Sequence, residues 1–394
     1  MARPDFDEII DRTGTNCNKW DDMQAIYGVP PGDGIAMWVA DMDFRPPASV
    51  QRAVEGMAAH GIYGYPGTNT AYTDAIRWWM ATRHGWDVAP EWILTAHGLV
   101  NGTALCVDAF TRPGDAVILM TPVYHAFARV TRAAGREVRE FPLALRDGEY
   151  RMDWPEWEKL LTGREKMLIL CSPHNPGGRV WSADELRQVA DFCAVHDLIL
   201  VSDEIHHDLV MPGARRHTVM AKAAPEIAPR LVTLTAATKT FNIAGAHIGN
   251  IIVADDGLRK ALQGRMMALG ISPGLFGLGM VAAAYSPEGA EWVDQLVAYL
   301  DGNRRLFDDG VNAIAGLRSM PLESTYLAWV DFAGTGMPRD EFTARVEKNA
   351  RIAANHGTSF GTGGESFLRF NIATPRARVA EAVARLQKAF GDLQ

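Results

Sequence analysis

Five short apolar runs, spaced through the middle of the chain, constrain the fold more than any other feature of the sequence. They cover residues 116–121, 167–172, 198–203, 231–236 and 249–254, and each is typical of a strand buried on both faces. Between two of them, residues 182–196 follow a helical pattern that opens with a capping box, Ser182 and Glu185. Alternating strands and helices predict an α/β protein with a mostly parallel mixed sheet between helices.

The two ends of the chain follow different patterns. Residues 1–45 are irregular and rich in glycine and proline. After residue 285 come helical patterns, strand patterns at 326–332 and 367–373, and a closing helix. A chain of 394 residues also exceeds the usual size of one hydrophobic core. We therefore predict a large domain over residues 46–284 and a smaller α+β domain built from residues 1–45 and 285–394.

Composition argues against several classes of partner. The chain has 39 basic and 47 acidic residues, a formal net charge of −8, and no basic run, so we expect neither a nucleic acid nor a membrane partner. The first ten residues lack a signal-peptide pattern, and no apolar run is long enough to span a bilayer. The four cysteines show neither zinc-ligand spacing nor a dense disulfide pattern, which favours a cytoplasmic location.

Polar side chains follow four of the five apolar runs, at the point where each predicted strand ends. They are Tyr124 and His125, Asn175, Asp203 and His206, and Lys239. Open α/β sheets bind ligands at the carboxyl ends of their parallel strands, so we expect these side chains to converge on one rim. This convergence predicts an enzyme.

Each of these residues also has a simpler explanation. A lone lysine is usually exposed, Asp203 could cap a helix, Asn175 could belong to a turn, and Tyr124 could pack in the core. Four such residues at successive strand ends favour one site instead. Adjacent residues on a strand point to opposite faces, so His206 and His207 are not expected to bind a metal together, and we predict no metal site.

The residue types point to pyridoxal 5′-phosphate. A lysine forms a Schiff base with an aldehyde cofactor, and this cofactor also needs an acid beside its ring nitrogen. We assign these two roles to Lys239 and Asp203. We expect Asn175 to donate a hydrogen bond to the ring O3′ and Tyr124 to stack on the ring. Backbone N–H groups at a helix start suit the phosphate. The candidates are Gly98, Leu99 and Val100.

Longer stretches carry a family resemblance. The segments "SPHNPGGRVWS" (172–182), "VSDEIHHDLVMPG" (201–213) and "TKTFNIAGAHIGNIIV" (238–253) resemble the fold-type I pyridoxal-phosphate enzymes of the aminotransferase class I/II superfamily. The segments "MWVADMDFRPP" (37–47) and "RHGWDVAPEWI" (83–93) are similar to its cystathionine β-lyase branch, the MalY/PatB-type C–S lyases. The resemblance runs from about residue 5 to the C-terminus.

The resemblance implies further roles. Lys239 would also move the substrate α-proton, and Arg369 would bind the substrate carboxylate through its guanidinium fork. The alternating apolar residues around Arg369 also allow a place on the solvent face of its strand. Tyr65 would reach the cofactor phosphate of a neighbouring subunit, which implies a homodimer with a shared active site. Trp38 would lie at the substrate entrance.

Four positions depart from the family pattern. His206 and His247 stand where aminotransferases commonly have tyrosine and arginine, which argues against a standard aminotransferase. Ala236 replaces a common serine, so the hydroxyl of Thr235 or Thr238 would serve the cofactor instead. His125 follows Tyr124 where the C–S lyases often have a second tyrosine. It would contact the substrate and could protonate the departing sulfur.

The sequence therefore predicts a C–S β-lyase of amino-acid metabolism, which cleaves L-cystathionine or a related cysteine S-conjugate to a thiol, pyruvate and ammonia. An aminotransferase is the alternative, because one scaffold supports both reactions. A regulatory binding protein on the same fold is the third hypothesis. The thiol substituent of the substrate stays open.

Overall fold

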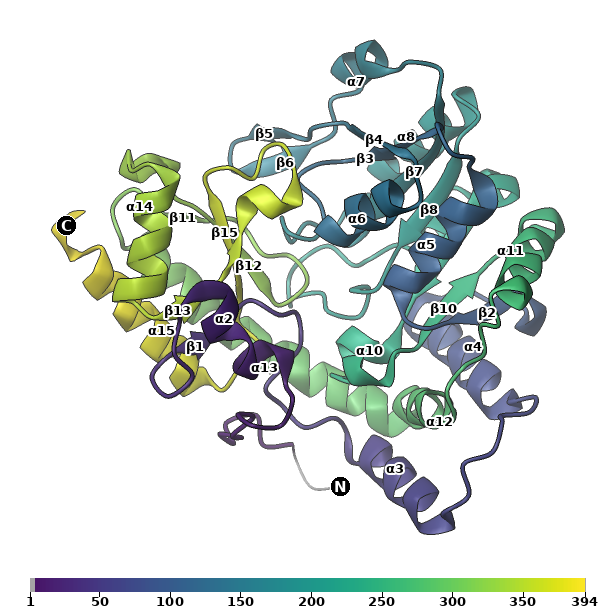
Figure 1. Cartoon of the computed structure of the whole chain (residues 1–394), viewed down its shortest axis with the longest axis horizontal. Coiled ribbons are helices and arrows are strands. Elements are labelled where there is room, and N and C mark those ends of the chain that lie inside the picture. The colour runs from purple at the N-terminus through teal and green to yellow at the C-terminus, as the bar shows by residue number, and fades with distance from the viewer. Residues whose placement is uncertain (1–3, 394) are drawn as a thin grey trace.

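A seven-stranded sheet forms the centre of the computed structural model, which describes residues 4–393 (Figure 1). Only β10 runs antiparallel to both of its neighbours; the other strands are parallel to one another, so the predicted mostly parallel mixed sheet is confirmed. In spatial order the strands are β2 (Ile93–Ala96), β10 (Gly249–Ile252), β9 (Leu231–Thr235), β8 (Ile199–Asp203), β7 (Glu165–Cys171), β3 (Ala116–Leu119) and β4 (Glu137–Glu140).

Both faces of the sheet are buried, as the apolar runs predict. Alternate residues of β7 point to opposite faces: Leu168 and Leu170 belong to one core cluster, and Met167 and Ile169 to another. The predicted capping box at Ser182 and Glu185 is present at the start of α8. The helices of this part are α3 (Ala48–His60), α4 (Thr70–His84), α5 (Leu99–Phe110), α6 (His125–Ala133), α7 (Trp154–Leu160), α8 (Ala183–Val195), α9 (Met220–Ala223), α10 (Ala237–Thr240), α11 (Asp256–Ala268) and α12 (Leu275–Ala284).

A second, antiparallel sheet is built from the C-terminal part of the chain. Its strands, in spatial order, are β11 (Arg318–Ser319), β12 (Leu327–Asp331), β15 (Phe367–Asn371) and β14 (Asn355–His356). The long α13 (Pro287–Asn312) packs beside α15 (Arg376–Ala389), which is the predicted closing helix. The predicted strands at 326–332 and 367–373 are β12 and β15. The domain limits near residues 45 and 285 stay a prediction.

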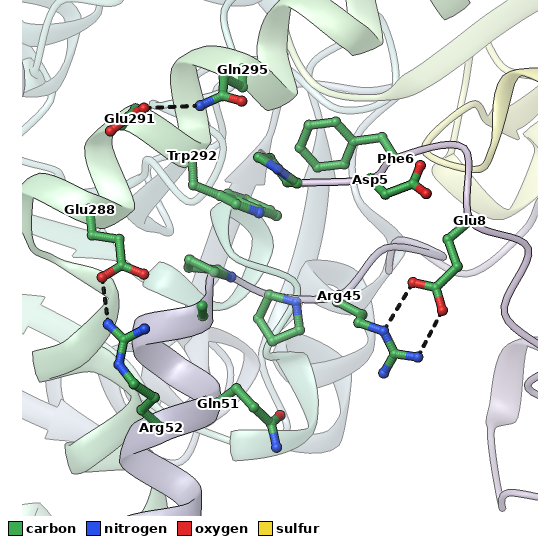
Figure 2. A pocket seen from close by; sticks show the side chains of 14 residues that line it. Asp5, Phe6, Glu8, Arg45, Gln51, Arg52, Glu288, Glu291, Trp292 and Gln295 are labelled. Atoms are coloured by element: carbon green, nitrogen blue, oxygen red, sulfur yellow. Dashed lines mark hydrogen bonds and ion pairs between the residues drawn. The ribbon is translucent and has the colours of Figure 1, made fainter. Parts of the chain in front are cut away.

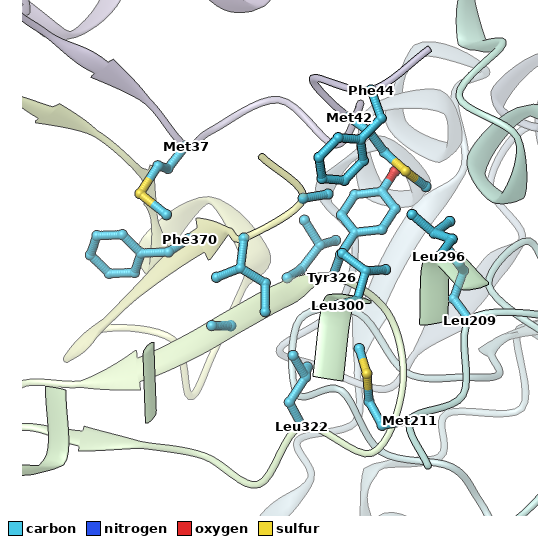
Figure 3. Close-up of a cluster of buried hydrophobic side chains, with 14 of the residues drawn as sticks. Met37, Met42, Phe44, Leu209, Met211, Leu296, Leu300, Leu322, Tyr326 and Phe370 are labelled. Carbon is cyan, nitrogen blue, oxygen red and sulfur yellow. The ribbon is translucent and has the colours of Figure 1, made fainter. Parts of the chain in front are cut away.

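The N-terminal segment is less irregular than expected. It contains α1 (Asn18–Asp21), α2 (Met23–Tyr27) and β1 (Ile35–Ala36), and β1 pairs with β13 (Ile352–Ala353). Met42 and Phe44 lie beside Tyr326, and Met37 lies beside Phe370, in one continuous core that also includes residues of α13 (Figure 3). The remaining elements are the hairpin β5 (Ala144–Arg146) and β6 (Glu149–Arg151), and α14 (Arg339–Ala344), which continues as a π-helix over Arg345–Asn349. No helix within residues 4–393 is long and apolar enough to cross a membrane.

Candidate active site

A cavity of about 570 Å³ lies at the carboxyl ends of the parallel strands. At least one predicted polar residue after each of β3, β7, β8 and β9 lines it, as the strand-end pattern predicts. The lining includes Tyr124, Asn175, Asp203, His206, Thr238 and Lys239. Parallel strand order therefore brings together side chains that lie more than 100 residues apart in the sequence.

Lys239 lies on the short helix α10, directly after β9. Its Nζ donates a hydrogen bond of 2.5 Å to the carbonyl oxygen of Ala40, and the hydroxyl of Tyr326 donates to the same oxygen over 3.0 Å. Burial lowers the pKa of Lys239 to about 8, and the nearby Arg369 lowers it too, against the attraction of Asp41 and Asp203. The amine is therefore close to the balance between its charged and nucleophilic forms near neutral pH.

The carbonyl that holds Lys239 is itself fixed by the C-terminal sheet. Asn371, at the end of β15, donates from Nδ2 to the backbone oxygens of Val39 and Asp41, on either side of Ala40. Asn242, just after α10, accepts from the backbone N–H of Met42 over 2.8 Å. These contacts hold the segment 39–42 against the lysine, so the N-terminal part of the chain completes the cavity.

Asp203, at the end of β8, is a buried carboxylate without a cationic partner. One oxygen accepts from the backbone N–H of Ile205 over 3.2 Å, and no lysine or arginine within residues 4–393 forms a salt bridge with it. Burial raises its pKa to about 7, with a further rise from Glu204 and a fall from Lys239. A buried carboxyl group that faces a cavity in this way fits a protonated ring nitrogen.

Arg369 lies behind Asn175, in the middle of β15. Its Nη1 donates to Oδ1 of Asn175 over 3.0 Å, and its Nη2 donates to the backbone oxygen of Trp38 over 2.9 Å and to Oδ1 of Asn355. Its Nε has no partner, and no carboxylate pairs with it in the described part of the chain. Burial lowers its pKa to about 10. A buried guanidinium with no acid partner is suited to an incoming carboxylate.

The solvent-face alternative for Arg369 is wrong. Every residue of β15 is buried, and Arg369 is only 2 % exposed, because β14 and β12 flank the strand and the guanidinium stacks over the ring of Phe360. The alternation of apolar residues on this strand therefore does not distinguish a solvent-exposed face from a buried one.

The cavity also contains a helix N-terminus. Gly98 caps α5 with φ of +81°, and Gly98, Leu99 and Val100 line the cavity. The turn sits directly on β10, since a Cβ at Gly249 would lie 2.5 Å from Leu99 Cδ2. The first N–H groups of a helix have no intrahelical acceptor, so this end suits a phosphate.

The two threonines that could replace the missing serine differ in position. Thr235 Oγ1 accepts from Nδ2 of Asn250 over 3.1 Å inside the sheet, whereas Thr238 lines the cavity. Thr238 is therefore the candidate. His247 is exposed with φ of +45° and lines the cavity near Thr238 and Gly98.

Tyr124 caps the start of α6, and its ring makes edge contacts with His125 and Phe127. His125 is not among the residues that line the cavity. Burial lowers the pKa of His125 to about 4, helped by Arg369 and Arg129. Its imidazole is thus uncharged near pH 7, which argues against the expected role as an acid.

His206 lines the cavity, and burial holds its pKa well below the usual range.

Trp38 and Tyr65, like His125 and Arg369, are not among the residues that line this cavity. Trp38 contributes only its carbonyl to Arg369, because its indole N–H donates to the backbone oxygen of Lys19 over 2.8 Å. Tyr65 lies in the loop between α3 and α4 and is fully exposed, away from the cavity of its own chain.

Sequence reasoning missed several residues of the site. Tyr326 is the first residue of the strand pattern 326–332, but nothing marked its hydroxyl as a partner of the Ala40 carbonyl. Asn355 and Arg129 carried no signal, although Asn355 orients Arg369 and Arg129 lines the cavity. A backbone carbonyl such as that of Ala40 has no side-chain signature at all.

A second cavity, of about 500 Å³, lies between the N-terminal segment and α13 (Figure 2). Both arginines that line it are paired with acids: Arg45 with Glu8 over 2.9 Å, and Arg52 with Glu288 over 2.5 Å. Apolar rings such as Trp292 form the rest of its wall.

Comparison with known proteins agrees with this geometry. A sequence profile described as aminotransferase class I and II matches residues 38–386. The cystathionine β-lyase PatB of Bacillus subtilis is 36% identical, over 98% of this chain and 99% of its own. Cystalysin of Treponema denticola, whose crystal structure contains pyridoxal 5′-phosphate, superposes with a TM-score of 0.95 at 34% identity and 100% coverage of both chains.

The pyridoxal-phosphate-bound C–S lyase of Staphylococcus hominis superposes with a TM-score of 0.89 at 29% identity, over 99% of this chain and 98% of its own. The resemblance predicted from the segments at residues 172–182, 201–213 and 238–253 is thereby confirmed. The profile match spans both sheets and every strand that contributes to the cavity. The chain belongs to the aminotransferase class I and II family.

Proposed function

We propose that this protein is a pyridoxal-phosphate-dependent C–S β-lyase that acts on L-cystathionine or a related cysteine S-conjugate. The observation that carries the proposal is the arrangement of Lys239 and Asp203 on one cavity, with the unpaired guanidinium of Arg369 behind it. The similarity to PatB, to cystalysin and to the C–S lyase of Staphylococcus hominis supports this activity over amino transfer.

The donor set fits the cofactor at both ends. Asp203 would pair with the ring nitrogen, and the amide N–H₂ of Asn175 would donate to the ring O3′. The first N–H groups of α5 would bind the phosphate, with Thr238 beside them. Tyr124 would cover one face of the ring. When bound, the cofactor supplies an electron sink that stabilises negative charge at the substrate α-carbon.

The residues of the chain then divide the remaining work. Arg369 binds the substrate carboxylate and fixes the direction of the α-carbon. Lys239, with a pKa of about 8, takes the α-proton as a free amine. The C–S bond breaks with its electron pair on sulfur, and the lysine ammonium is the acid that returns a proton to it. With one water consumed, the products are a thiol, pyruvate and ammonia.

The test of this function uses purified protein and L-cystathionine without any keto acid. Pyruvate and free thiol are expected in equal amounts, and Lys239→Ala should release neither. A surface variant, Lys166→Ala, should match the parent protein. Amino transfer that appears only after a keto acid is added, without pyruvate release from cystathionine, would identify an aminotransferase instead. Cofactor binding without turnover of any amino acid would point to a binding protein.

We propose further that the active unit is a homodimer in which Tyr65 serves the neighbouring subunit. Tyr65 is fully exposed, and Ile62 and Tyr63 of the same loop are more than half exposed. Apolar groups grouped on one loop in this way favour an interface.

All four cysteines are free thiols, which supports a reducing, cytoplasmic location.

A mixed dimer tests the shared site. Neither Lys239→Ala nor Tyr65→Ala alone should be fully active. A mixed dimer contains one Lys239→Ala chain and one Tyr65→Ala chain. It has one complete site only if the Tyr65 of the first chain reaches across the interface to the Lys239 of the second. Equal mixing should then restore about a quarter of the parent activity, because half of the dimers are mixed and each has one working site. No recovery after subunit exchange would place Tyr65 outside the partner site.

A further inference from the structure

A cluster of histidines and acids lies on the other side of the turn that follows β8, away from the cofactor cavity. His206 lines that cavity, whereas its neighbour His207 points into the cluster. His84, the last residue of α4, and Asp208 complete the inner group. A separate cavity of about 540 Å³ opens onto all three residues of this group.

The nitrogen and oxygen atoms of the inner group face one another. His84 Nε2 lies 2.9 Å from Asp208 Oδ1, and His207 Nε2 lies 3.2 Å from Asp208 Oδ2. The three ligand atoms all lie within 4.8 Å of one another. The two imidazole rings stack with their centroids 4.2 Å apart, so both present their nitrogens to the same carboxylate.

Asp208 is held in position by two further donors. The indole N–H of Trp79 donates to Oδ1 over 3.0 Å, and the hydroxyl of Thr240 donates to Oδ2 over 2.9 Å. Each oxygen thus keeps a second lone pair toward an imidazole. Outer hydrogen bonds of this kind orient the ligands of metal sites.

His207 is the least satisfied member of the cluster. Its side chain is fully buried, and within residues 4–393 neither ring nitrogen makes a hydrogen bond; the 3.2 Å approach of Nε2 to Asp208 is an ion-pair contact only. A buried polar ring without hydrogen bonds costs free energy unless something fills the gap between it and its neighbours.

The charges of the cluster also call for a cation. Glu204, next to the inner group, pairs with His217 over 2.8 Å. Glu204 and Asp208 are both buried, and within residues 4–393 neither contacts a lysine or an arginine. Two buried negative charges are balanced either by two histidine protons or by one divalent ion.

We propose that His84, His207 and Asp208 bind a divalent transition-metal ion, with Zn²⁺ as the best fit. Two imidazoles and one carboxylate are three ligands of a tetrahedral zinc site, and water from the adjoining cavity supplies the fourth. Magnesium and calcium prefer oxygen ligands alone. His206 and His207 face different cavities and do not share an ion, whereas His84 and His207 come from different elements and meet in one.

Such an ion would have a structural role. It would join the end of α4 to the turn after β8, and through Asp208 and Thr240 to α10, which carries Lys239. It would not touch the substrate or the cofactor.

The experiment measures zinc bound to untagged, cofactor-loaded protein after equilibration with Zn²⁺ and dialysis, by elemental mass spectrometry. The parent protein should retain about one zinc ion per chain, and His84→Ala should weaken binding by more than about 100-fold, since loss of a ligand exceeds loss of an outer contact. His60→Ala is the matched control, because His60 also ends a helix before a left-handed glycine but is exposed.

Substitution of Co²⁺ provides a second readout, because a tetrahedral site gives strong visible absorption that should be missing in His84→Ala. If His207→Ala fails to fold, the His84→Ala variant still tests the zinc site. Its cofactor absorbance shows whether that variant is folded. No zinc in the dialysed parent, or equal zinc in the parent and His84→Ala, would overturn the proposal.

Discussion

Nη1 of Arg369 donates a hydrogen bond of 3.0 Å to Oδ1 of Asn175, so one contact joins the proposed substrate site to the proposed cofactor site. An amide has one acceptor and two donors. Because the guanidinium occupies the acceptor, the N–H₂ group of Asn175 is the part of the amide that would serve the cofactor oxygen. The arginine therefore also positions the donor that the cofactor oxygen would need.

The first prediction concerns Arg369→Ala. Loss of a charge-assisted hydrogen bond costs about 1.5–3 kcal/mol, so kcat/KM for cystathionine should fall by roughly 10- to 100-fold. Cofactor content, read from absorbance, should change much less. The exposed Arg112→Ala is the control. An unchanged preference for amino acids over their decarboxylated amines would contradict the role.

Lys239→Ala should remove the covalent attachment of the cofactor. General acid–base catalysis contributes about 100- to 10,000-fold, so turnover should fall by at least this factor. Borohydride reduction followed by peptide mapping of the parent should place the pyridoxyl group on Lys239. A label on Lys222 or any other lysine would refute the assignment.

The pKa of Asp203 predicts how the stability of the cofactor-free protein depends on pH. Its pKa rises from 3.8 in the unfolded chain to about 7 in the folded one. The folded state therefore binds more protons between these values, and its stability falls as pH rises through this window. Asp203→Asn removes this loss of stability. The variant should therefore gain on the order of 1 kcal/mol or more of unfolding free energy at pH 8.

Urea unfolding of both cofactor-free proteins at pH 5 and pH 8 measures this effect. The gain from Asp203→Asn should be clearly larger at pH 8 than at pH 5. Asp191→Asn, at an exposed position, should show no such difference. An equal gain at both pH values would mean that Asp203 titrates normally in the folded chain.

Two buried tyrosines test the hydrogen bond that helps to fix the Ala40 carbonyl. Tyr326 donates to this carbonyl, whereas the hydroxyl of Tyr285 is buried without a partner. Tyr326→Phe should therefore cost about 0.5–1.5 kcal/mol of unfolding free energy, and Tyr285→Phe should cost nothing or stabilise. Thermal unfolding of the two variants compares them directly, and equal losses would contradict the assigned contact.

Much of the sheet and of the cavity could be predicted from the sequence because both depend on local patterns. Apolar runs fixed the strands, and the polar residue after each run, such as Asn175 or Asp203, was then placed by parallel strand order alone. The direction of β10 could not be predicted, since a buried strand carries the same pattern in either direction.

Contacts between distant segments were the part that sequence reasoning could not reach. The burial of Arg369 depends on β12 and β14 on either side, including Asn355, its partner on β14, and alternation along β15 does not encode these neighbours. The cluster around His207 likewise needs His84, which lies more than 100 residues earlier. Only the folded chain brings such groups together.

The position of β10 between β2 and β9 also determines when the sheet can be completed during synthesis. In the described part of the chain, β10 is the sole partner of β2, and Ile93 pairs with Ile252, roughly 160 residues later. As the chain leaves the ribosome, β2 emerges first and has no strand to join until β10 has been made. The apolar residues Ile93 and Leu94 thus stay unpaired on the nascent chain while roughly 160 further residues are made, so this segment is exposed long after its own synthesis.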